Sequence, residues 1–119
     1  MNETHLSFYL KANRIHVFVN SLRSIGSPSR ICFMISDDGQ NLMISPYAKR
    51  DFKSHAVPQR VYKGDGSLEV SSYKLCRLIA EMQKWDLERS YRVPGSVIPE
   101  KKVAVFNLCE AEVIEHPEN

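Results

Sequence analysis

The sequence predicts an α+β protein built from two related halves, residues 1–46 and 67–119, joined by a basic connecting segment, residues 47–66. The order strand, short amphipathic helix, strand, tight turn, strand occurs within residues 14–46 and again within 67–108. Two copies of one supersecondary unit typically pack about a pseudo-twofold axis. We therefore expect a compact, antiparallel-rich domain that could close into a barrel.

The first half begins with alternating residues. Leu6, Phe8 and Leu10 alternate with polar or amphipathic neighbours, which indicates a half-buried strand. After the strand at 14–17, apolar residues at 19, 22 and 25 follow helical spacing. Gly26 supplies the left-handed conformation that ends a helix. This helix has about two turns, so it must be held by packing.

A hairpin is predicted next, because the apolar runs 30–36 and 41–45 flank Asp37, Asp38 and Gly39. Both faces of the first of these strands are apolar. A sheet that is apolar on both faces must be covered twice. One cover is the helix, and the other is either the second half of the chain or another subunit.

The connecting segment carries most of the basic residues, together with three apolar anchors. The anchors are Phe52, Val57 and Val61. The runs 52–57 and 59–63 are each compatible with a short edge strand. The segment is therefore expected to be a seam between the halves, not a flexible linker.

The second half contains the clearest helix. Ser71 or Ser72 is expected to cap it. An apolar stripe predicts the buried face; its members are Leu75, Leu78, Ile79, Met82 and Trp85.

The rest of the second half is predicted to be mainly strand. The strand after the helix is expected to turn at Pro94 and Gly95, and a strand at 102–108 follows. Residues 110–115 suit either one more helical turn or a short strand, and with Glu118 they give this end of the chain an acidic character.

Bulk composition indicates a single globular domain. The chain has 119 residues, 43% hydrophobic and 25% charged, with a net charge of +2. Its apolar runs are shorter than the roughly 18 residues of a membrane span. The first residues lack a basic leader followed by an apolar core. We expect a cytoplasmic location and no membrane partner.

The residue patterns point away from catalysis. Cys32, Cys76 and Cys109 are widely spaced among apolar neighbours, which favours buried reduced thiols over zinc ligands. The four histidines show no paired spacing, and the glycines near residue 65 do not lead into a phosphate-binding helix. We expect no catalytic residue, no metal site and no cofactor.

Two surface features remain as candidates for binding. Basic side chains suit phosphate contacts, although a solvated face or the protection of edge strands explains them as well. The candidate nucleic-acid-binding residues are Lys11, Arg14, Arg23, Lys49, Arg50, Lys53, Arg60 and Lys63. The interleaved aromatic residues Tyr47, Phe52 and Tyr62 suit a protein interface, or partial burial under the seam.

The first half also resembles the AbrB/MazE type of swapped-hairpin module. The matching segments are Arg14 to Val17, Leu22 to Gly26, Ile31 to Ile35, Asp37 to Gly39, and Leu42 to Pro46. Members of that family are dimeric DNA-binding regulators or antitoxins with basic residues near the first strand. The resemblance implies that Lys11, Arg14 and Arg23 contact DNA.

Two functions follow as expectations. The first is a homodimeric, non-enzymatic protein that binds duplex DNA as a transcription regulator or antitoxin-like repressor, with Arg14, Arg50 and Arg60 reaching bases. The second is a protein-binding inhibitor or adaptor of the kind carried by bacterial mobile elements or phages. In the second, the three aromatic residues would anchor a host protein.

Overall fold

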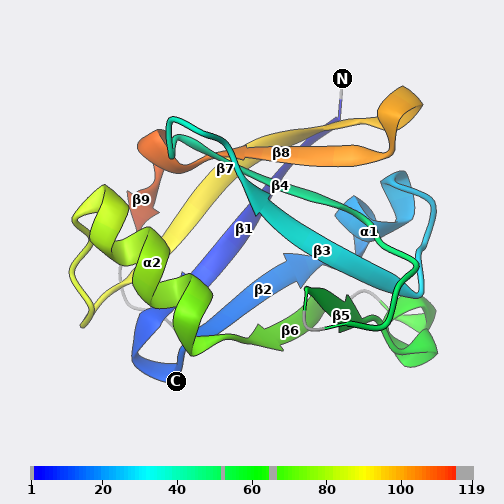
Figure 1. Cartoon of the computed structure of the whole chain (residues 1–119), viewed down its shortest axis with the longest axis horizontal. Helices are drawn as coiled ribbons and strands as arrows, with labels where there is room; N and C mark the ends of the chain where they lie inside the picture. Colours follow the sequence, from blue (N-terminus) through cyan, green and yellow to red (C-terminus); the bar gives the residue numbers. More distant parts are fainter. Residues whose placement is uncertain (1, 52, 65–66, 115–119) are drawn as a thin grey trace.

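The computed structural model describes residues 2–51, 53–64 and 67–114. Its strands form one antiparallel sheet in the order β5-β3-β4-β8-β7-β1-β2-β6, with β9 added beside β7. The sheet curls into a nearly closed, barrel-like body measuring 33 × 33 × 31 Å (Figure 1). The antiparallel, barrel-like part of the predicted fold class is therefore confirmed.

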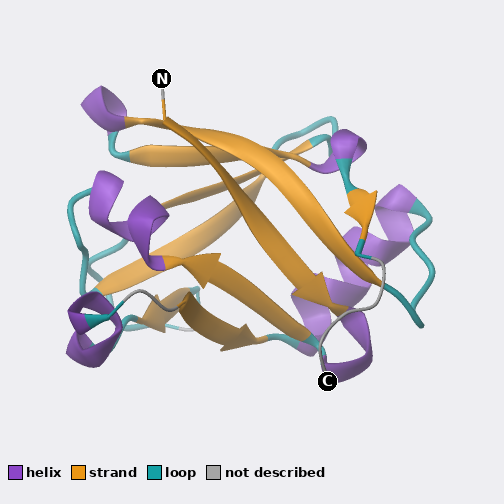
Figure 2. Ribbon diagram, turned by 180° about the vertical axis from the view of Figure 1, so that it is seen from behind, coloured by secondary structure: helices purple, strands orange, loops and turns teal. Residues whose placement is uncertain are grey.

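Helices separate most of the strands along the chain, except that β3, β4 and β5 follow one another directly. The strands are β1 (Asn2–Tyr9), β2 (Arg14–Phe18), β3 (Arg30–Ile35), β4 (Asn41–Pro46), β5 (Ser54–Ala56), β6 (Ser67–Ser71), β7 (Ser90–Ile98), β8 (Val103–Asn107) and β9 (Glu112–Val113). The helices are α1 (Val19–Ser24), α2 (Tyr73–Gln83) and the 3-10 turns η1 (Leu10–Ala12), η2 (Gln59–Lys63), η3 (Pro99–Lys101) and η4 (Leu108–Glu110). Seen from behind, the long strands cross the body and the helices lie at its sides (Figure 2).

The predicted hairpin and its preceding helix are confirmed. β3 and β4 pair directly, from Ile35 opposite Leu42 onward, across the predicted turn. Gly39 in that turn has φ +73°, and Gly26 after α1 has φ +102°. Both angles lie in the left-handed region that favours glycine. The local glycine signals therefore placed both chain reversals correctly.

The connecting segment corrects one prediction. The edge strand expected at 52–57 is present as β5, but the run 59–63 is the 3-10 turn η2 and not a strand. Pro58 begins this turn, and the amide of Val61 donates to its carbonyl at 3.0 Å. The turn buries a single side chain, Val61, in the core. A 3-10 turn can do this without pairing with a neighbouring strand. Phe52 lies outside the described residues.

The helix α2 begins where predicted. The hydroxyl of Ser72 accepts a hydrogen bond from the Leu75 amide at 3.2 Å, which is the expected N-cap. Its predicted buried stripe is partly wrong, since Leu78 is 46% exposed and Met82 is 39% exposed. The face buried against the barrel centres on Ile79 instead, with Cys76 and Ala80 beside it.

The predicted turn at Pro94 and Gly95 is wrong, because β7 runs straight through both residues. Pro94 pairs in register with His5 of β1, at the point where β7 leaves β9 and begins pairing with β8. Gly95 lies opposite Phe106. A Cβ at residue 95 would sit 2.4 Å from the Val105 carbonyl oxygen, so this glycine permits a close approach of strands and not a turn.

The core fills the interior of the barrel with residues from almost every element. Its largest fully buried side chains include Phe8 and Phe106, one from each half. Cys32 and Cys76 are buried as expected, but Cys109 is exposed, because it sits on the short turn η4 at the surface. The second cover expected over β3 is incomplete, since Met34 is 43% exposed.

Candidate interaction groove

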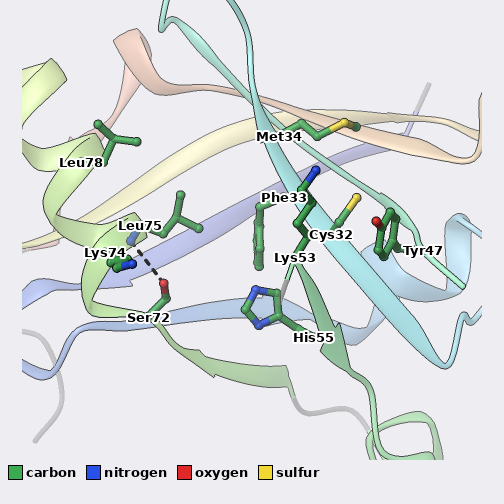
Figure 3. Close-up of a pocket in the computed structure, with 10 residues that line it drawn as sticks. All are labelled: Cys32, Phe33, Met34, Tyr47, Lys53, His55, Ser72, Lys74, Leu75 and Leu78. Carbon is green, nitrogen blue, oxygen red and sulfur yellow. Dashed lines mark hydrogen bonds between the residues drawn. The ribbon is translucent and has the colours of Figure 1, made fainter. Parts of the chain in front are cut away.

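A mostly apolar hollow lies between β3 and α2. It has a volume of about 470 Å³. It opens where β5 ends and where the sheet fails to close (Figure 3). Its lining comes from β3, the loop before β5, β5 itself and the first two turns of α2. The lining residues are Cys32, Phe33, Met34, Tyr47, Lys53, His55, Ser72, Lys74, Leu75 and Leu78.

The β3 wall contributes both faces of one strand. Phe33 points to the core side, while Cys32 and Met34 belong to the opposite face. All three line the hollow, so it extends across the edge of β3 and not along one face only. The ring of Phe33 meets the ring of His55 edge to face, with centroids 5.3 Å apart. This pair forms the floor between the two walls (Figure 3).

The α2 wall presents Leu75 and Leu78, one turn apart on the helix. The helix is held at both ends. The amide of Ser72 donates to the Asn13 carbonyl at 3.0 Å, and the side-chain amide of Gln83 donates to the Gly39 carbonyl at 2.9 Å. Because α2 is tied to the β3–β4 turn and to the start of β2, the wall it forms is a fixed one.

The loop before β5 forms the remaining rim. The hydroxyl of Tyr47 donates to the Asp51 carboxylate at 2.9 Å, and this hydrogen bond raises the pKa of Tyr47. The same carboxylate accepts from the Lys53 amide at 2.9 Å. The loop is thereby folded back on itself, with Tyr47 and Lys53 both at the groove.

His55 makes the floor of the groove less polar than its residue type suggests. Burial lowers the pKa of His55, and the charge of Arg30 lowers it further. Arg30 is itself held by two hydrogen bonds to the Ser54 hydroxyl, at 2.7 and 2.8 Å. At neutral pH the neutral imidazole is therefore favoured, and it presents an aromatic surface and not a charge.

The basic residues predicted near the first strand are occupied within the chain. Arg14 forms an ion pair with Glu69 at 2.7 Å. Lys11 approaches Glu88 at 3.7 Å. The guanidinium of Arg23 donates to the carbonyls of residues 62 and 64, at 2.8 and 3.0 Å. Phosphate contacts by these residues would have to replace bonds that the fold already provides.

The basic residues of the connecting segment are exposed and lie in two places. Lys49, Arg50 and Lys53 belong to the loop before β5, whereas Arg60 and Lys63 belong to η2, which contacts α1. Within residues 2–51, 53–64 and 67–114, no ion pair joins any of them to an acid. The structure brings one of the eight predicted basic residues, Lys53, into the groove.

The predicted aromatic anchors also separate. Tyr47 lines the groove. Tyr62 packs against the core, and its hydroxyl donates to the Pro28 carbonyl at 2.6 Å, so it serves the seam between segments. Burial raises the pKa of Tyr62. The third predicted anchor, Phe52, cannot be placed because it falls outside the described ranges.

Several groove residues were missed by the sequence reasoning. Met34 and Leu78 were assigned to covered surfaces, and Lys74 and His55 received no role. One signal did exist: the second apolar face of residues 30–36 required a second cover. Among the described residues, no three His, Cys, Asp or Glu side chains gather closely enough to hold a metal ion.

Comparison with known proteins finds no matching family model, no similar characterised protein and no similar solved structure. Over the described ranges, neither α-helix has the length and apolar character needed to cross a membrane.

Proposed function

We propose that this protein is a non-enzymatic binding protein that recognises another protein through the groove between β3 and α2. The observation that carries the proposal is the exposure of Met34 (43%) and Leu78 (46%) on the two walls of one hollow. Exposed large apolar side chains that gather in a hollow with a polar rim are typical of interfaces. The protein would act as an inhibitor or adaptor.

The energetics favour binding through the apolar side chains of the groove. Full burial of a leucine or methionine side chain contributes about 1.5–3 kcal/mol. The two exposed side chains, together with Leu75 and the rings of Phe33 and Tyr47, therefore form the kind of central apolar cluster that dominates binding energy. The fixed position of α2 limits the ordering cost on this side of the complex.

Selection from a displayed library of random 12-residue peptides tests the proposal. Selected peptides should bind the Leu78→Gln variant at least about tenfold more weakly, which corresponds to a loss of about 1.4 kcal/mol. Leu87→Gln is the matched control, because Leu87 is a 37% exposed leucine outside the groove. Peptides that bind both variants as well as they bind the wild type would refute the proposal.

DNA binding is the second candidate function, and the exposed cations of the connecting segment favour it. Phosphate contacts by such residues release counterions, so affinity would fall steeply with salt. Binding to random duplex DNA should weaken in Arg50→Glu and Arg60→Glu, while Leu78→Gln should leave it unchanged. The absence of binding at about 50 mM salt would count against this candidate.

We also propose that the chain arose from two copies of one unit, as the repeated order of elements in residues 14–46 and 67–108 suggests. The pairing pattern supports this. If β1, β2, β3 and β4 correspond in order to β5, β6, β7 and β8, each pair in one half should have a counterpart in the other. The pair β1·β7 then corresponds to β5·β3, and β3·β4 corresponds to β7·β8, while β2·β6 corresponds to itself; all of these pairs are observed. The pair β1·β2 has as its counterpart β5·β6, which the described strands do not form. The gap in the barrel lies where that pair would be.

A further inference from the structure

The free edge of β3 borders the groove. β3 pairs with β4 along residues 31–35, but on its other side the described residues pair with it, through β5, only at residues 30–32. By contrast, β7 has β8 on one side and all eight residues of β1 on the other. Among the described strands, β6 pairs with β2 alone. The edge of β3 extends past the end of the short strand that begins to cover it (Figure 3).

Backbone alternation decides which groups of β3 face the groove. The carbonyl of Ser29 accepts from the Val57 amide at 2.8 Å, on the β5 side of the strand. The direction of N–H and C=O groups alternates between successive residues of a strand. Phe33 and Ile35 therefore also direct their N–H and C=O groups to that side. Among the described residues, no strand pairs with either residue on that side.

The side chains around this edge suit an added strand. The groove runs across the edge, with Cys32 and Met34 on one face of β3 and Phe33 on the other. Alternate side chains of an extended segment would then pack toward Phe33 and Leu75 on one face, and toward Met34 on the other.

The rim of the groove is cationic. Lys53 and Lys74 line it, and Lys49 and Arg50 belong to the loop that enters β5. Asp51 of the same loop lies near Lys49 and Lys53, whose charges help to lower its pKa, but no acid among the described residues forms an ion pair with any of these four, and the rim keeps a positive charge. Complementary charge therefore favours aspartate and glutamate on the occupant.

We propose that the groove binds an acidic, extended segment of a partner protein, which pairs with the free edge of β3 and continues the line of β5. The proposal rests on the proposed protein-binding function and specifies its ligand. The mode is strand addition, in which main-chain hydrogen bonds supply affinity and alternate side-chain pockets supply specificity. In the proposed duplication β3 corresponds to β7 and β5 to β1. The added strand would therefore lengthen β5 along β3, as the long strand β1 runs along β7.

The test uses the peptides selected on the full-length protein, measured by fluorescence anisotropy. We expect them to be enriched in aspartate and glutamate. N-methylation of one alternate set of peptide amides should weaken binding at least tenfold, while N-methylation of the other set should change it little, since only one set faces β3. Lys74→Gln should weaken binding about two- to fivefold and reduce its salt dependence. Lys101→Gln, an exposed lysine on η3, is the matched control and should do neither.

The outcomes separate the two proposals. Groove-dependent peptides that are basic or neutral, or that respond equally to N-methylation at both sets, would overturn strand addition and leave protein binding intact. A selection that yields no Leu78-dependent peptide would overturn both. If sedimentation shows a dimer that Leu78→Gln dissociates, the occupant is a second copy of this chain, and the proposal of a separate acidic partner is wrong.

Discussion

The close approach of β7 and β8 at Gly95 provides the sharpest test of the fold. An alanine Cβ there would lie 2.4 Å from the Val105 carbonyl oxygen and 2.9 Å from the Phe106 Cα, whereas ordinary contact begins at 3.4 Å. Both neighbours are backbone atoms, so neither can rotate away. The strands would have to separate by about 1 Å, within a ladder that continues to β4 and β1.

We expect Gly95→Ala to lower the free energy of unfolding by about 1–2 kcal/mol. Overpacking of this kind costs about 1–3 kcal/mol, and the smaller entropy of the unfolded alanine chain offsets about 0.4–1 kcal/mol of that cost. With a typical urea dependence of about 2 kcal/mol per molar, the unfolding midpoint should fall by roughly 0.5–1 M.

Urea unfolding can be followed through Trp85, the single tryptophan, which stacks on Tyr91 with ring centroids 4.5 Å apart. Gly64→Ala is the matched control. Its Cβ would meet nothing within 4 Å, and its φ is −140°, so we expect no loss or a small gain in stability. If Gly95→Ala unfolds at the wild-type midpoint, or if Gly64→Ala loses as much, the proposed close approach of β7 and β8 is refuted.

Three further predictions concern the helix cap, the histidines and the thiols. Ser72→Ala should destabilise the fold by about 1 kcal/mol through loss of the α2 N-cap, and an unchanged urea midpoint would contradict that role. Burial lowers the pKa of His5 and of His55 below 6.5, and the charges of neighbouring arginines lower it further. The unfolded chain therefore takes up protons at a higher pH than the folded protein, so the free energy of unfolding should fall as the pH drops below about 7. Replacing both histidines with asparagine should make the urea midpoint nearly independent of pH between about 7 and 5. A thiol reagent should label the exposed Cys109 rapidly in the native state. Burial raises the pKa of Cys76 to about 11, so this thiol should react only on unfolding. Equal labelling rates would show that Cys76 is accessible in the native protein.

Where the sequence predicted the fold correctly, the signal was local. Glycine in the left-handed region ended α1 and closed the β3–β4 turn, and a serine capped α2. The wrong prediction at Pro94 and Gly95 also involved a glycine, but this glycine is required by a contact with another strand. Gly95 was expected to make a turn, but the glycine is needed because two strands approach closely there. Nothing within a few residues of position 95 distinguishes these two uses.

The groove was predictable only in part. Apolar residues on both faces of β3 showed that a second cover was required. The helical period of α2 identified Leu78 and Met82 as apolar, but not as exposed. Their exposure depends on how α2 docks, which is set by the distant contacts of Gln83 with Gly39 and of Ser72 with Asn13.

The amino-acid order by itself determined most of the strands, the two α-helices, the hairpin, the helix cap and the antiparallel character of the sheet, because alternation, capping and turn chemistry act over a few neighbouring residues. Only the tertiary structure decided that β5 stops after three residues, that the barrel stays open beside β3, and that Lys53 and Lys74 meet at the same hollow. Those features depend on pairing between segments far apart in the chain, and no local pattern encodes which edge is left without a partner.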